Sequence, residues 1–183
     1  ALPTALISLL MLRFLARNGW TTGRSMLLAL GYGLGTMAFP WATVFFGHQL
    51  SAFFAFSAFY LVWSSRWNDS GAPALRRFGA GLLLGFLPVI EYPGAIASGL
   101  IGLYALAVPG RRGSALVIAG ALIGILPLPI YNEMVLGNPA VLSYSFYKEG
   151  STFPAHQQGI AGVSWPRIGV LSEITFGRQR GLF

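Results

Sequence analysis

The distribution of charged residues along the chain is the feature that most restricts its possible folds. No Asp, Glu, Lys or Arg occurs at residues 25–65, 92–110 or 113–132, which are uncharged stretches of 41, 19 and 20 residues. A helix that spans a membrane needs roughly 20 mostly apolar residues. The second and third stretches are each long enough for one span, and the first is long enough for two spans joined by a tight turn. The charge pattern therefore predicts a polytopic membrane protein built from helices.

The composition excludes several other classes of protein. Charged residues make up 9% of the chain and apolar residues 55%, whereas a soluble domain carries about 25% charged residues. The net charge is +7, but a nucleic-acid site needs basic residues clustered on one face, and here they fall in small groups between apolar stretches. We therefore predict no nucleic-acid partner. The chain has no Cys and no spaced set of His ligands, so we also predict no metal site.

The apolar segments predict an all-α fold with about six membrane spans. Pro40 is expected to end the second span, and Pro127 and Pro129 are expected to bend or end the sixth. The predicted spans are residues 2–15, 25–39, 49–63, 78–90, 95–108 and 114–131.

The remainder of the chain is more polar and predicts a second part. Residues 1–131 are expected to form the transmembrane bundle, and residues 132–183 an extracytoplasmic or interfacial segment. Within this segment we predict an interfacial helix at residues 168–176, because Arg167 and Glu173 leave too short an apolar stretch for a seventh span. The chain begins at Ala1, not at Met, and we expect it to be a fragment of a longer protein.

Basic residues predict the orientation of the bundle. When the loops are assigned alternately to two sides, one side receives Arg13, Arg17, Arg24, Arg66, Arg76, Arg77, Arg111 and Arg112. The short loops of the other side, at His48 and Glu91, hold no Lys or Arg. An excess of basic residues in short loops marks the cytoplasmic side, where arginines also contact anionic lipid headgroups. The loops at His48 and Glu91, and the tail after Glu133, are therefore predicted to be extracytoplasmic.

Three glycine pairs have the GxxxG spacing, which lets helices approach closely in lipid. We expect close helix packing at each of them: Gly31 with Gly35, Gly81 with Gly85, and Gly120 with Gly124.

Candidate site residues lie on the predicted extracytoplasmic side. Glu91 ends an apolar segment and is followed by Tyr92; an ionisable group at a membrane boundary either serves a functional site or only reaches water. His48 is either a structural residue at a helix start or part of the same site. In the tail, cations next to aromatic side chains either hold a phosphate group or form a salt-bridged surface loop.

Several short motifs together resemble the GT-C superfamily of bacterial membrane glycosyltransferases, which includes protein O-mannosyltransferases and aminoarabinose transferases. The first motif is FPWATVFFGHQL at residues 39–50. The second is GFL at 85–87 with EYP at 91–93. The third comprises YN at 131–132, GNP at 137–139, YSFY at 144–147 and RGLF at 180–183. The resemblance covers roughly residues 31–183.

The resemblance implies an integral enzyme of the bacterial inner membrane. Such an enzyme transfers a sugar from a polyprenyl-phosphate carrier, which is its donor substrate, to an extracytoplasmic acceptor, and no further cofactor is expected. The family's catalytic base usually lies in the first extracytoplasmic loop, which we expect before Ala1, so the base is not assigned. The sugar or acceptor is expected to bind Glu91, Tyr92, His48 and Tyr147. The carrier phosphate is expected to bind Lys148, Arg178 and Arg180.

Two other functions remain open on the sequence. One is a non-enzymatic membrane subunit that packs against neighbouring subunits of a larger complex through its GxxxG faces. The other is a transporter. Apart from Arg13, no charge lies deep within a predicted span, and no paired half-helices are evident, which disfavours a transporter.

Overall fold

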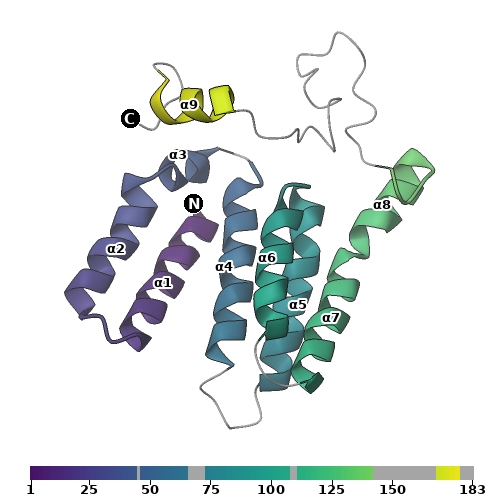
Figure 1. Ribbon diagram of the computed structural model, residues 1–183, viewed down its shortest axis with the longest axis horizontal. Coiled ribbons are helices and arrows are strands. Elements are labelled where there is room, and N and C mark those ends of the chain that lie inside the picture. The colour runs from purple at the N-terminus through teal and green to yellow at the C-terminus, as the bar shows by residue number, and fades with distance from the viewer. Residues whose placement is uncertain (45, 66–72, 108–110, 142–167, 178–183) are drawn as a thin grey trace. The chain divides into compact units, whose positions relative to one another are not determined.

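The computed structural model describes residues 1–44, 46–65, 73–107, 111–141 and 168–177, and every regular element in them is a helix (Figure 1). The all-α prediction is therefore confirmed for these residues. The chain divides into two compact units, Ala1–Ile130 and Tyr131–Phe183. The helices are α1 (Leu2–Arg17), α2 (Thr22–Gly35), α3 (Ala38–Thr43), α4 (His48–Ser64), α5 (Pro73–Ile90), α6 (Gly94–Ala107), α7 (Arg111–Ile125), α8 (Pro127–Leu136) and α9 (Ile168–Phe176).

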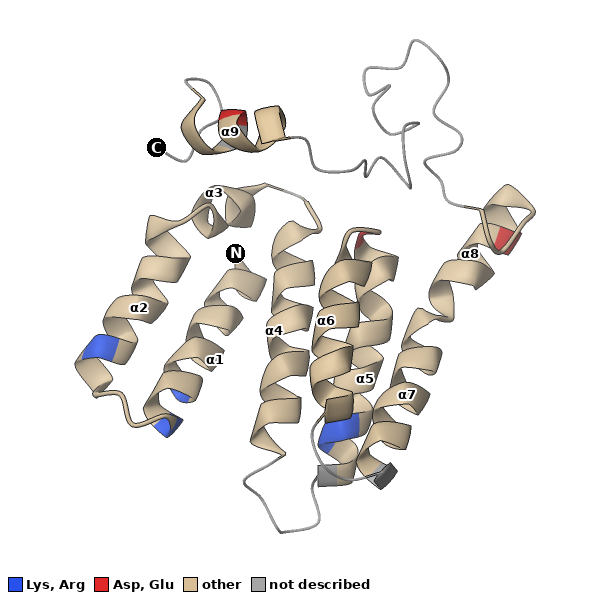
Figure 2. Cartoon of the chain, in the orientation of Figure 1, with Lys and Arg blue, Asp and Glu red and all other residues tan. Residues whose placement is uncertain are grey.

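The long helices of the first unit lie side by side with their axes in nearly the same direction (Figure 1). Helix α5 packs against α4, α6 and α7, and α1 packs against α2 and α4. Successive helices run up and down, so that chain segments far apart in sequence meet at the two ends of the unit. The arginines of α1, α2 and α5 gather at one end, and Glu91 lies at the opposite end (Figure 2).

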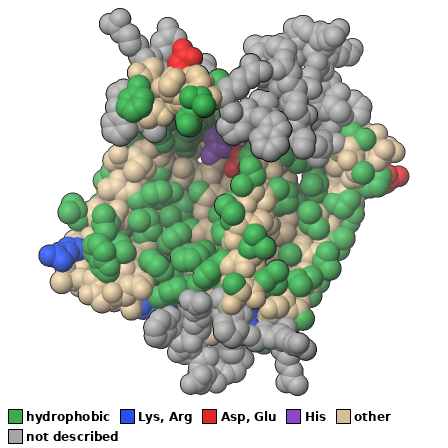
Figure 3. All heavy atoms as spheres, in the orientation of Figure 1, with side chains coloured by type: hydrophobic (Ala, Val, Ile, Leu, Met, Phe, Trp, Pro, Cys, Tyr) green, Lys and Arg blue, Asp and Glu red, His purple; other side chains and the backbone are tan. Residues whose placement is uncertain are grey.

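Large apolar side chains cover the flanks of the first unit (Figure 3). Five leucines on α2, α6 and α7 have between 62% and 72% of their surface exposed: Leu27, Leu34, Leu100, Leu103 and Leu122. Soluble monomers rarely expose contiguous apolar patches of more than a few hundred Å². Flanks of this kind fit a hydrocarbon environment or a partner protein better than water.

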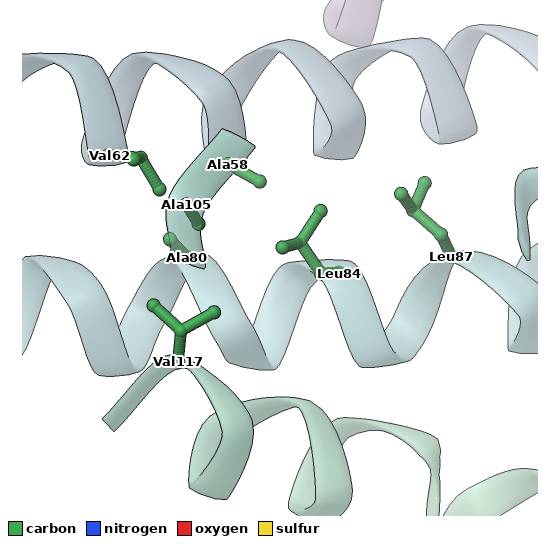
Figure 4. Packing of buried hydrophobic residues seen from close by; sticks show 7 residues of the cluster. All are labelled: Ala58, Val62, Ala80, Leu84, Leu87, Ala105 and Val117. Carbon is green, nitrogen blue, oxygen red and sulfur yellow. The ribbon is translucent and has the colours of Figure 1, made fainter. Parts of the chain in front are cut away.

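The buried core of the first unit is small and lies where four helices meet (Figure 4). Leu84 and Leu87 of α5 are its largest fully buried side chains, with no more than 2% of their surface exposed. The other members are small or medium-sized side chains from α4, α5, α6 and α7: Ala58, Val62, Ala80, Ala105 and Val117. Small residues at these positions let the helices approach closely.

The closest approach is between α5 and α7, where two of the predicted glycine pairs interlock. A Cβ atom on Gly81 or Gly85 would lie less than 3.0 Å from the backbone of α7, at Val117 and Ala121 respectively. In the opposite direction, a Cβ on Gly120 or on Gly124 would meet the backbone of α5 at less than 3.0 Å. Close packing is thus confirmed for both pairs.

The third glycine pair behaves differently. A Cβ on Gly31 or Gly35 would meet nothing within 4 Å, so the expectation of close packing at this pair is wrong within this chain. The two glycines lie on an outer surface of α2. Spacing alone could not show this, because the same GxxxG pattern serves contacts inside a chain and contacts between chains.

One segment among the described residues, Gly113–Leu136, is long and apolar enough to cross a membrane, with 24 residues and a mean hydropathy of 2.1 over its most apolar 18-residue window. The other long helices have 14 to 18 residues. At 1.5 Å per residue they extend about 21 to 27 Å, which is short of the roughly 30 Å hydrocarbon core of a bilayer. The structure therefore supports one clear span, and the expectation of six is not confirmed.

Prolines lie at two helix boundaries, and one of them acts differently from expectation. Pro40 does not simply end a helix, because α2 already ends at Gly35 and Pro40 is the third residue of the separate helix α3. The first-turn N–H groups of a helix have no partner within the helix, so a proline there costs no hydrogen bond. At Pro127 the expectation that proline bends or ends the sixth segment is confirmed, because α7 ends at Ile125 and a separate helix, α8, begins at Pro127. Pro127 and Pro129 lie in the first turn of α8, which continues to Leu136, beyond the predicted end at residue 131.

Candidate functional site

The start of α4 meets the end of α5 at the end of the first unit that lies opposite the arginines of α1, α2 and α5 (Figure 2). His48 is the first residue of α4, and Glu91 directly follows the last residue of α5. The imidazole Nδ1 of His48 lies 2.7 Å from Oε2 of Glu91. The two side chains keep 48% and 23% of their surface exposed, so the pair is open to ligands. Such a pair forms a short charge-assisted hydrogen bond when the imidazole is protonated.

Backbone contacts bring the two helix ends together. A Cβ added to Gly47, just before α4, would lie 3.0 Å from Cγ2 of Ile90, the last residue of α5. After Ile90 the chain turns tightly, and the N–H of Gly94 donates to the carbonyl of Glu91 at 2.9 Å. A Cβ on Gly94 would lie 2.8 Å from the carbonyl of Leu87. Glycine at positions 47 and 94 thus permits the close approach that places Glu91 beside His48.

Aromatic side chains from α3 and the following loop surround the imidazole. The Trp41 ring meets the His48 ring edge-on, with centroids 4.6 Å apart, and Phe46 stacks on it with centroids 5.8 Å apart and an interplanar angle of 3°. Trp41 and Phe46 also contact each other edge-on at 5.4 Å. These contacts restrict the rotation of His48 and make one side of the pair apolar.

A buried polar cluster lies one residue further along α4. Oε1 of Gln49 accepts hydrogen bonds from the Thr4 hydroxyl at 3.0 Å and from the Tyr32 hydroxyl at 3.4 Å. Thr4 and Gln49 are 5% and 9% exposed. The three residues come from α1, α2 and α4, so this cluster joins the start of α4 to α1 and α2.

A cavity of about 350 Å³ opens beside the aromatic residues. Among the described residues, those that line the cavity come from α1, α3, α4 and the loop between α3 and α4. Neither His48 nor Glu91 lines it. The lining includes the residues on either side of His48 in sequence, Gly47 and Gln49, together with Trp41 and Phe46. The walls are mostly apolar, as in pockets that bind small molecules.

The structure brings together two of the predicted site residues, His48 and Glu91, and Tyr92 is the half-buried neighbour of Glu91. Tyr147, Lys148, Arg178 and Arg180 lie outside the described residues. Among the described residues, no three His, Asp or Glu side chains are grouped as metal ligands would be.

Four residues around the site had no role predicted from the sequence. These are Thr4, Tyr32, Trp41 and Gln49. The sequence does indicate a role for Gln49, because it is a polar residue next to His48 within a long apolar stretch. No signal in the sequence connected it with Thr4 or Tyr32. Comparisons with known protein families, with curated proteins and with solved structures found no match to this chain.

Proposed function

We propose that this chain is the membrane-embedded part of a glycosyltransferase that moves a sugar from a polyprenyl-phosphate carrier to an extracytoplasmic acceptor. The observation that carries the proposal is the His48–Glu91 pair. Two ionisable side chains that are 43 residues apart in sequence meet at 2.7 Å, at the end of the helical unit opposite its arginines. Ionisable groups at a membrane boundary are costly and are commonly functional.

The membrane part of the proposal is supported by the exposed apolar flanks of α2, α6 and α7. In the proposed arrangement α1, α2, α4, α5, α6 and the segment Gly113–Leu136 cross the inner membrane. The arginine-rich end is cytoplasmic, as the bias of basic residues favours. Helices shorter than the hydrocarbon core are accommodated by local thinning of the bilayer, at a cost of fractions of a kcal/mol per Å of mismatch.

The proposed chemistry uses the pair for binding. The Glu91 carboxylate accepts hydrogen bonds from hydroxyl groups of the sugar or the acceptor, and His48 holds that carboxylate in position. Tyr92 contacts the same substrate. Lys148, Arg178 and Arg180 neutralise the carrier phosphate, which stabilises it as a leaving group.

The proposal is tested in the cells that encode this protein, with the chromosomal gene changed to Glu91→Gln. A blocked transferase leaves its donor unused, so the polyprenyl-phosphate-linked sugar is expected to accumulate. Lipid extracts analysed by mass spectrometry measure this pool and identify the sugar. The matched control is Glu133→Gln, which alters an exposed carboxylate on α8. If no lipid-linked sugar accumulates in Glu91→Gln cells, although the protein reaches its normal level, the proposal is wrong.

A second function, a non-enzymatic subunit of a membrane complex, is favoured by one observation. A Cβ on Gly31 or Gly35 of α2 would meet nothing within 4 Å, whereas the other two glycine pairs pack against a neighbouring helix of the same chain. Substitution of both glycines by Leu is expected to release a co-purifying membrane protein if this function is correct. An unchanged set of co-purifying proteins would argue against it.

A further inference from the structure

The polar cluster of Thr4, Tyr32 and Gln49 is linked to the His48–Glu91 pair through Gln49, the residue after His48 in α4, and has no role in the proposed chemistry. Both hydroxyl groups donate to the same oxygen, Oε1 of Gln49. Amides and hydroxyls bonded between helices in apolar surroundings have few competing partners. The cluster therefore holds the side chain of Gln49 in one direction, towards α1 and α2.

The direction of Gln49 determines the direction of His48. The two are the first and second residues after the N-cap of α4, and at 3.6 residues per turn neighbouring side chains point about 100° apart around the helix axis. If the first turn of α4 rotates, both side chains move together. With Gln49 held on α1 and α2, His48 is turned towards the end of α5, where Glu91 lies.

The first turn of α4 has no capping side chain, and its N-cap residue is Gly47. The first N–H groups of a helix have no partner within the helix, and Gly47 has no side chain with which to accept a hydrogen bond from them. Contacts with other parts of the chain must then order this turn. These contacts are Gly47 against Ile90, the rings of Trp41 and Phe46 against His48, and the Gln49 cluster, which alone among the described residues joins this turn to α1 and α2 by hydrogen bonds.

We propose that Thr4, Tyr32 and Gln49 are positioning residues that fix the first turn of α4 and thereby set His48 against Glu91. They act through the helix and touch neither partner of the pair. The proposal concerns the geometry of the site, so it stands or falls independently of the transferase activity proposed above.

Histidine NMR tests the proposal, because the chain contains only two histidines. The full chain is labelled with ¹⁵N-histidine in lipid nanodiscs, and His156→Gln leaves His48 as the one reporter. The ¹⁵N shifts of the imidazole report on its hydrogen bonding. Glu91→Gln gives the signal of His48 without its carboxylate partner.

Thr4→Val is the main variant, since it removes one hydroxyl from the cluster and nearly preserves the shape of the side chain. The lost hydrogen bond is expected to raise the unpaired fraction of His48 about two- to tenfold, which moves the imidazole signal towards that of Glu91→Gln. Gln49→Leu removes the acceptor and is expected to move it further. Thr4→Ser keeps the hydroxyl and is expected to give the wild-type signal.

Three outcomes would overturn the proposal. The first is a wild-type His48 signal in both Thr4→Val and Gln49→Leu. The second is an equal change in Thr4→Ser and Thr4→Val, which would point to lost packing instead of a lost hydrogen bond. The third is no difference between Glu91→Gln and the wild type, since the pair itself would then be absent. If Gln49→Leu does not fold, the comparison of the His48 signal between Thr4→Val and Thr4→Ser still tests the proposal.

Discussion

Replacing a glycine at the α5–α7 contact by alanine is expected to destabilise the protein. At Gly85 the new Cβ would lie less than 3.0 Å from the backbone carbonyl of Ala121, and a backbone carbonyl cannot move aside as a side chain can. Non-bonded carbon contacts are optimal at about 3.5–4.0 Å, so α7 has to move away by on the order of 1 Å. That movement also loosens Val117 in the core.

Overpacking of this kind costs about 1–3 kcal/mol. The gain in helix propensity from Gly to Ala offsets at most about 1 kcal/mol in water, and less in a membrane, where the separated helices keep their structure. The expected result for Gly85→Ala is therefore a net loss of about 1–2 kcal/mol in the free energy of unfolding. Titration of the purified protein with SDS in mixed micelles, followed by circular dichroism, measures it.

The matched control is Gly99→Ala on α6, where a Cβ meets nothing within 4 Å. A substitution in open space is expected to change the free energy of unfolding by no more than about 0.5 kcal/mol. If Gly85→Ala and Gly99→Ala unfold at the same SDS fraction, the close approach of α5 and α7 is refuted.

Three more predictions concern the core, a helix end and the orientation. Leu84→Ala removes a side chain that is 2% exposed and is expected to lower the free energy of unfolding by about 2–5 kcal/mol. Leu100→Ala, on the exposed face of α6, is the nearly neutral control in the same SDS titration. Gly19→Ala places a side chain at a φ of +82° and is expected to cost roughly 1 kcal/mol, whereas Gly23→Ala is expected to cost less; equal values would contradict the left-handed turn. The chain lacks Cys, so a single introduced cysteine can be labelled selectively. A cysteine at Pro93 is expected to react with a membrane-impermeant maleimide added outside intact spheroplasts, and one at Thr22 is expected to react only after lysis. The reverse pattern would contradict the proposed orientation.

Local sequence signals were sufficient to predict most of the helices. The sequence predicted six apolar segments, and each corresponds to a helix of the first unit, the last of them continuing into α8. Helix α3 was missed because proline was taken as a terminator. Whether a proline ends a helix or lies in the first turn of the next depends on which N–H groups lack partners, and neighbouring residues alone do not determine that.

The candidate site was only partly predictable, because its contacts join distant parts of the chain. Charge bias placed His48 and Glu91 on the same side of the bundle, but their separation of 2.7 Å depends on α4 and α5 being neighbours. The hydrogen bond between Thr4 and Gln49 joins residues 45 positions apart, and no local pattern indicates it. The same holds for the glycine pairs, whose spacing predicted close packing without showing which faces would be filled.

The rate of sugar transfer by the purified full-length protein in lipid nanodiscs tests the central claim most directly. The donor is the radiolabelled polyprenyl-phosphate sugar that accumulates in Glu91→Gln cells, supplied with the membrane fraction of those cells as acceptor. The account predicts transfer by the wild type and by Glu133→Gln, and none above background by Glu91→Gln, although all three unfold at the same SDS fraction. Transfer by Glu91→Gln at the wild-type rate would contradict the role proposed for the His48–Glu91 pair.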